Sequence, residues 1–280
     1  MINKIIRQLR KINQKYFQIS FKKHNLDQLQ STILNDLNND GIYLGKFQDF
    51  QELGADMSWM NYKNEIINFL DEKEKIGAHK SNKKGSYVIG MRNIPDHILR
   101  RIYSFTLNEK LVQIFENYFS LPLHYKGVDI RKDVNDGNKI ETRLWHIDSE
   151  DNRIIKILIY LDKVDSLGGP FMYIKKRFIN KNTKFEKKRD DGRIEDETME
   201  KLCNTSNLME FTNETYDFAI VDTANIYHRG KLPEKNRYAA FFCYNSKYPL
   251  EPSFCVNFQK KDKSMIEEKF LNKVAESNLN

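Results

Sequence analysis

The chain has 280 residues, of which 40% are hydrophobic and 30% charged, and this composition indicates a soluble globular protein and excludes a disordered one. Mean hydropathy is −0.68, and the most apolar stretch, 154–164, contains Lys156 and Asp162 and is too short to span a bilayer. The three cysteines fit neither a disulfide framework nor a zinc finger, and no apolar core follows the basic N-terminus, so we expect a cytoplasmic protein.

The formal net charge of +7 is concentrated in residues 1–24, which contain seven Lys or Arg and no acidic residue. The rest of the chain is formally neutral, with 39 basic and 39 acidic residues, so we expect no nucleic-acid partner. The segment also has apolar residues at helical spacing, namely Ile2, Ile5, Ile6, Leu9 and Ile12. We favour a terminal helix packed on the domain or a solvated tail; the alternative is weak contact with a membrane surface or a partner.

Residues 25–120 have the apolar spacing of helices. Leu29, Ile33 and Leu37 share one face of a helix predicted over 26–40, which Gly41 ends before a short strand. Further helices are predicted over 58–76, from Pro95 onward and over 107–118, with a loop at 79–86.

From residue 121 to about 250 the pattern changes to short segments rich in β-branched and aromatic residues. These predict strands of an all-β barrel or jelly roll, over 123–134, 141–146, 154–164, 170–176, 216–222 and 237–244. The highly charged stretch 180–200 predicts a surface insertion, either disordered or a lid. A capping box at 264–267 predicts a C-terminal helix over 264–276. We therefore expect one domain over 25–280, mainly β with flanking α-helices.

The stretch Trp145-His146-Ile147-Asp148 carries the first candidate for chemistry. In a strand, His146 and Asp148 would point to the same side, which makes an imidazole and a carboxylate adjacent. His228, before a turn at Gly230, is the natural third ligand. Two histidines and one carboxylate leave three open positions on a metal, which is the ligand set of non-haem Fe(II) oxygenases. No thiolate accompanies them, so a structural zinc site is disfavoured.

Several stretches resemble the phytanoyl-CoA dioxygenase family of Fe(II)- and 2-oxoglutarate-dependent oxygenases, over roughly residues 26–245. The resemblance lies in 36–44, Trp145-His146-Ile147-Asp148, 157–165 with the turn Gly169-Pro170, His228-Arg229-Gly230, and the strand that begins at Arg237. Only the His-x-Asp…His…Arg set is specific.

The resemblance implies a double-stranded β-helix, the cupin-like jelly roll, with Fe(II) bound by His146, Asp148 and His228. It implies that Arg237 pairs with the distal carboxylate of 2-oxoglutarate, a role that suits a planar guanidinium. It further implies that the protein consumes O2 and 2-oxoglutarate, releases succinate and CO2, and hydroxylates a C–H bond of a small-molecule, lipid or glycan substrate.

Some positions depart from the family's pattern. Where many members have a hydroxyl residue two positions after the distal histidine, this chain has Gly230. The family's polar residue on the strand before the His-x-Asp element is assigned to Arg131, with Lys126 and Asp129 as rivals and a solvated strand edge as the simpler alternative. Arg143 could point toward the mouth of the site.

Other interpretations use the same residues. Trp145 is expected in the core. Arg237 could form a surface salt bridge at the start of a strand. A cupin-type zinc or manganese hydrolase or isomerase would use the same three ligands without Arg237, and a non-catalytic binding protein would act through residues 1–24.

Overall fold

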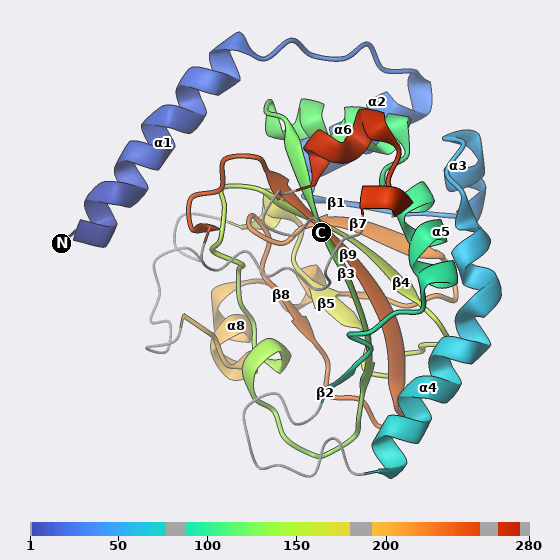
Figure 1. Ribbon diagram of the computed structural model, residues 1–280. Helices are drawn as coiled ribbons and strands as arrows, with labels where there is room; N and C mark the ends of the chain where they lie inside the picture. The colour runs from blue at the N-terminus through green and yellow to red at the C-terminus, as the bar shows by residue number, and fades with distance from the viewer. Residues whose placement is uncertain (1, 77–87, 180–191, 253–262, 275–280) are drawn as a thin grey trace.

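The computed structural model describes residues 2–76, 88–179, 192–252 and 263–274. Two antiparallel sheets form its centre (Figure 1). The larger has the strand order β1-β7-β4-β9-β3-β2 and the smaller β6-β5-β8. The strands are β1 (Ile42–Gly45), β2 (Val88–Gly90), β3 (Leu123–Asp133), β4 (Ile154–Tyr160), β5 (Phe171–Tyr173), β6 (Met209–Phe211), β7 (Phe218–Asp222), β8 (His228–Gly230) and β9 (Arg237–Ser246).

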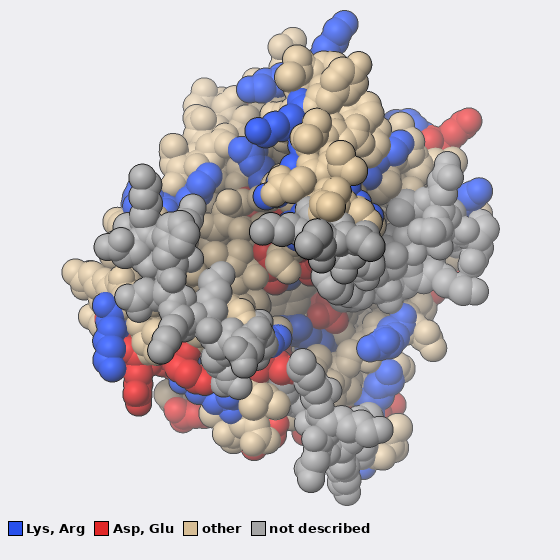
Figure 2. All heavy atoms as spheres, turned by 90° about the vertical axis from the view of Figure 1, so that its left-hand side faces the viewer, with Lys and Arg blue, Asp and Glu red and all other residues tan. Residues whose placement is uncertain are grey.

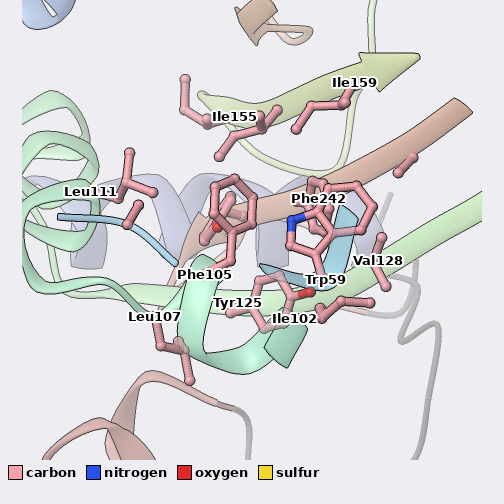
Figure 3. Close-up of a cluster of buried hydrophobic side chains, with 14 of the residues drawn as sticks. Trp59, Ile102, Phe105, Leu107, Leu111, Tyr125, Val128, Ile155, Ile159 and Phe242 are labelled. Atoms are coloured by element: carbon pink, nitrogen blue, oxygen red, sulfur yellow. The ribbon is translucent and has the colours of Figure 1, made fainter. Parts of the chain in front are cut away.

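Helices cover the outer face of the large sheet. They are α2 (Gln28–Asn39), α3 (Phe47–Glu52), the 3₁₀-helix η1 (Met57–Tyr62), α4 (Lys63–Lys75), α5 (Asp96–Thr106) and α6 (Glu109–Phe119). Figure 3 shows the core between these helices and the sheet. There the rings of Trp59 and Phe105 each pack against the ring of Phe242 of β9, with a centroid-to-centroid distance of 5.1 Å in both pairs. This apolar layer leaves the opposite face of the sheet free to build a site.

Strand β4 is buried on both faces, which explains its nearly continuous apolar sequence. Ile155, Ile157 and Ile159 belong to the helix-side core. Leu158 and Tyr160 alternate with them and pack with residues of β5 and β6 between the two sheets. Lys156 shares this inner face, so a charged side chain points into the space between the sheets.

Helix α2 shows how local sequence sets an element's limits. The Asp27 carboxylate accepts a hydrogen bond from the backbone N–H of Gln30, and the Gln30 side chain accepts one from the backbone N–H of Asp27. The helix is followed by Gly41, whose φ of +74° favours glycine and turns the chain into β1. This helix and strand confirm the sequence-based expectation.

Two expected elements differ in the structure. The strand predicted over 141–146 is instead the 3₁₀-helix η2 (Glu141–Arg143), where Glu141 has a φ of +53°, followed by isolated β-bridges at Trp145 and His146. The C-terminal helix expected over 264–276 is realised as two short 3₁₀-helices, η6 (Lys263–Met265) and η7 (Glu268–Lys273), because Glu267, in the expected first turn, has an extended ψ of 137° that interrupts an α-helix.

The charged insertion is described only in part. The loop expected at 79–86 and residues 180–191 lie outside the described residues. Within the remainder of 180–200, helix α8 (Asp196–Leu202) begins, and its Met199 is buried with Trp145 and Met172 beside the small sheet.

Helix α1 (Ile2–Ser20) lies along one edge of the molecule (Figure 1). It contacts the domain through polar side chains, as a terminal helix packed on the domain would, but its apolar residues Leu9 and Ile12 are exposed rather than packed. Among the described helices, none combines the length and the apolar character needed to cross a membrane.

Candidate metal centre

The three candidate ligands meet at one place between the sheets. The ligand atoms of His146, Asp148 and His228 all lie within 4.8 Å of one another. Nε2 of His146 is 3.8 Å and Nε2 of His228 is 3.9 Å from Oδ1 of Asp148. An ion with bonds of about 2 Å fits between donors at such separations. The structure therefore brings His228 next to His146 and Asp148, although it lies about 80 residues away from them in the sequence.

Backbone hydrogen bonds hold the two histidines side by side. The N–H of His146 donates to the carbonyl of His228 and the N–H of His228 donates to that of His146, each at 3.0 Å. The backbone N–H of Asp148 donates to the carbonyl of Thr223, which follows β7, at 2.9 Å. The ligand positions are thus set by the pairing of distant backbone segments.

Hydrogen bonds also orient the imidazole rings. Nδ1 of His146 lies 2.8 Å from the carbonyl of Leu144, and Nδ1 of His228 lies 3.2 Å from that of Ile226. A carbonyl only accepts, so each Nδ1 carries the proton and each neutral ring presents its Nε2 lone pair to the site.

Protonation states in the site suit a cation. Burial lowers the pKa of His228 to about 3 and also lowers that of His146, so both rings are neutral at physiological pH. Burial alone would raise the pKa of Asp148, but the nearby Lys156 ammonium lowers it below its usual range. The site therefore offers two neutral nitrogen donors and one carboxylate, the hard and borderline donor set that suits Fe(II).

The ligands open onto a cleft with an empty volume of about 670 Å³, counted to its mouth. The cleft is lined by Asp129, Arg131, Thr142, His146, Asp148, Lys156, Tyr160, Phe171, Val221, Thr223, His228, Arg229, Gly230, Arg237, Phe241 and Cys243. The lining contains four Lys or Arg side chains and two carboxylates, so cationic groups outnumber anionic ones in the cleft wall.

Arg237 lies in the cleft wall with only 4% of its side chain exposed. It is the cross-strand partner of Asp133, and its Nε and Nη2 donate to Asp133 Oδ2 at 3.1 and 2.7 Å. Its Nη1 donates to the carbonyl of Gly169. The alternative of a surface salt bridge does not hold, because the ion pair between Arg237 and Asp133 is buried.

Gly230 leaves space beside this guanidinium. A Cβ at this position would lie 3.1 Å from Nη2 of Arg237 and 3.6 Å from its Nη1. The absence of a side chain at Gly230 therefore leaves room beside Nη2 and Nη1 of Arg237.

Arg131 also lines the cleft. Its Nη1 donates to Asp129 at 3.2 Å, its Nε lies 3.4 Å from Asp133, and its guanidinium stacks over Phe241 at 4.5 Å from the ring centre. Of the two alternatives to Arg131 for the polar residue on this strand, Asp129 also lines the cleft. Lys126 is buried and is not among the described residues that line it.

Two neighbours of the His-x-Asp element have other surroundings. Arg143 is 2% exposed and does not reach the described cleft wall, so the expectation that it points to the mouth is wrong. It donates to the carbonyls of Val134 and Asn138 and pairs with Asp136, which ties down the loop after β3. Trp145 is 1% exposed, and its core role is confirmed.

Lys156 is the most informative residue that sequence reasoning did not select. Its Nζ lies 2.6 Å from Oδ2 of Asp148, on the oxygen that does not face the histidines. The ammonium thus orients the carboxylate and balances its charge. The available signal was a single charged residue within an otherwise apolar strand.

Replacing Lys156 with methionine is expected to weaken binding of a divalent metal at this candidate site by about 10- to 100-fold, because Asp148 loses the partner that orients it. The measurement is chelator-competition titration of the metal. Lys132→Met is the matched control, because Lys132 is also a buried strand lysine in an ion pair, with Asp71 at 2.6 Å, but on the helix side of the sheet. Equal metal affinity in both variants would contradict a role for Lys156 at the site.

The comparisons with known proteins identify the fold. No protein-family profile and no curated protein sequence matches the chain. The structure of EctD from S. alaskensis with 2-oxoglutarate and 5-hydroxyectoine is similar over 81% of this chain and 80% of that chain, with a TM-score of 0.51 and 13% identity.

Two other solved structures are more distant. AviO1 from Streptomyces viridochromogenes Tue57 covers 80% of this chain and 97% of its own, with a TM-score of 0.48 and 13% identity. The structure of HygX from Streptomyces hygroscopicus with nickel and 2-oxoglutarate bound is similar over 90% of this chain and 96% of that chain, with a TM-score of 0.46 and 12% identity. The likeness to EctD confirms the expected jelly roll with flanking helices, and at this identity it shows the fold alone.

Proposed function

We propose that this protein is an Fe(II)- and 2-oxoglutarate-dependent dioxygenase that hydroxylates a C–H bond of a small-molecule, lipid or glycan substrate. One observation carries the proposal: His146, Asp148 and His228 converge at a cleft whose wall also holds the buried guanidinium of Arg237. A cupin-type zinc or manganese hydrolase would need the three ligands but not the arginine.

The three ligands would hold the iron on one side and leave its other side open to the cleft. When bound, the iron would activate O2 with electrons from 2-oxoglutarate, releasing succinate and CO2 and hydroxylating the substrate. The protein's own part is to keep both histidines neutral, to aim their Nε2 atoms through the Nδ1 hydrogen bonds, and to orient Asp148 through Lys156.

Arg237 is proposed to bind the distal carboxylate of 2-oxoglutarate. Asp133 and Gly169 hold its guanidinium in place, and the missing side chain at Gly230 leaves an approach for the anion. Arg131 is proposed as a second contact, because it lines the same cleft and shares Asp133 with Arg237.

Two likenesses support the proposal. The sequence resembles the phytanoyl-CoA dioxygenase family at the metal ligands and at Arg237. The fold is similar to that of EctD, whose structure was solved with 2-oxoglutarate and 5-hydroxyectoine, so this fold accommodates such a co-substrate together with a small hydroxylated molecule.

Anaerobic titration of the metal-free protein with Fe(II) and 2-oxoglutarate tests the proposal. We expect the visible charge-transfer band of the iron chelate to appear when both are present, and not with either alone. A folded protein that binds Fe(II) without forming the band would contradict the proposal and favour the zinc or manganese enzyme. Zinc and manganese titrations of the same preparation provide that comparison.

A further inference from the structure

Helix α1 turns its apolar side away from the protein. Five residues at helical spacing form one stripe along its outer face: Ile5, Leu9, Ile12, Tyr16 and Ile19. They are 55%, 61%, 64%, 70% and 87% exposed. We call them the outer stripe. A terminal helix that only packs on its domain shows the reverse arrangement, with the apolar face inward.

Polar contacts hold the opposite side of α1 to the domain. Arg7 pairs with Glu251 at 2.7 Å, and Arg10 donates to the carbonyl of Leu250 at 2.9 Å. Gln14 is buried and donates to Asp151 at 2.6 Å. These bonds span two turns of the helix, so the outward direction of the stripe is set by specific partners on the domain.

The charge around the outer stripe favours one kind of partner. Lys11 and Lys15 lie on the same helix, Lys22 and Lys23 follow it, and residues 1–24 contain no acidic residue. Figure 2 looks onto this side of the molecule, where blue Lys and Arg side chains flank tan ones at the top of the view. An apolar stripe with basic flanks matches a bilayer surface that contains anionic lipids.

A second copy of the chain fits this face less well. Pairing two α1 helices through their stripes would bring two wholly basic segments together, with no acidic side chain on either helix to balance them. An anionic bilayer supplies both an apolar layer for the stripe and negative charge for the lysines.

We propose that α1 docks the protein on anionic lipid bilayers, with the outer stripe in the headgroup and upper acyl region and the domain held against the surface by Arg7, Arg10 and Gln14. Arg7 also lies 3.5 Å from the carbonyl of Ser149, the residue after Asp148. Docking through α1 would therefore connect the bilayer-bound helix to the loop that follows Asp148. The docking itself does not depend on the proposed oxygenase activity.

Vesicle flotation of the full chain tests the docking. We expect binding to vesicles of 70% phosphatidylcholine and 30% phosphatidylglycerol to be at least about tenfold stronger than to pure phosphatidylcholine, and to weaken between 0.05 and 0.5 M NaCl. Leu9→Asn with Ile12→Asn should weaken it at least about tenfold through lost apolar burial. Lys11→Gln with Lys15→Gln should weaken it about fivefold per lysine on the anionic vesicles alone.

Ile76→Asn is the matched control, because Ile76 is 82% exposed at the end of α4, away from α1, and its replacement should leave binding unchanged. Absence of binding to anionic vesicles at low salt would overturn the proposal. The proposal would also be overturned if Ile76→Asn weakened vesicle binding as much as Leu9→Asn with Ile12→Asn does. A dimer seen by light scattering and broken by Leu9→Asn with Ile12→Asn would instead assign the outer stripe to a second copy. None of these measurements needs iron or 2-oxoglutarate, so their failure is distinct from failure of the proposed function.

Discussion

Replacing His228 with alanine is expected to weaken Fe(II) binding by more than about 100-fold. His228 would supply one of three donors, and even residues that only orient a metal ligand change affinity by about 10- to 100-fold. The charge-transfer band with 2-oxoglutarate should disappear as well. Metal content after gel filtration and the anaerobic titration measure the two effects.

His97→Ala is the control for this substitution, since the His97 side chain is 51% exposed on α5, on the helix side of the large sheet. It should bind iron as the wild type does. Stoichiometric, tightly held iron in the His228→Ala protein would show that the metal sits elsewhere, and the assignment of all three ligands would then be wrong.

Replacing Arg237 with alanine is expected to have two separate effects. Affinity for 2-oxoglutarate should fall by about 100-fold or more, because a buried charged partner of the carboxylate is lost. The free energy of unfolding should also fall, by about 3–5 kcal/mol, because Asp133 is 1% exposed and would lose its closest ion-pair partner. Calorimetric titration and denaturant unfolding measure them independently.

Adding Asp133→Asn to Arg237→Ala separates the two effects. The double variant removes both charges of the pair, so most of the lost stability should return, while Arg131 keeps its partner Asp129. Binding of 2-oxoglutarate should stay weak. If the second substitution restored 2-oxoglutarate binding, Arg237 would be a structural residue rather than a co-substrate ligand.

The pH dependence of stability gives a further check on this pair. Burial alone would raise the pKa of Asp133, but Arg131 and Arg237 lower it below its usual value. The ionised carboxylate therefore stabilises the fold above pH about 4, and this contribution is lost as the pH falls into the acid range. The stability difference between wild type and Asp133→Asn should narrow on acidification.

Much of the site could be predicted from the chain because it depends on local chemistry. The His146-x-Asp148 spacing, the apolar strand around Leu158 and the capped helix after Asp27 each have a short-range physical cause. His228 was also selected from the sequence as the candidate third ligand, but its position beside His146 follows only from the pairing of the two residues in the fold.

The parts that sequence reasoning missed depend on long-range register. Asp133 stands opposite Arg237 only because β3 and β9 pair in that alignment, and a single strand of alternating charges does not reveal it. Lys156 was visible as a charged residue among apolar ones, but its partner Asp148 is fixed by packing between sheets. The turn at Glu141 was predicted as strand because local propensity does not indicate its positive φ.

The reciprocal backbone bond between His146 and His228 has a consequence for how the metal and the fold depend on each other. An unfolded chain offers only the local His-x-Asp pair, so the complete ligand set exists only after distant strands have joined. Iron would bind the native state far more tightly than the unfolded one and would stabilise it by linkage. The ion would thus bind only after the jelly roll has folded and would then stabilise it. Tightly bound iron would therefore indicate that the protein is in its native state.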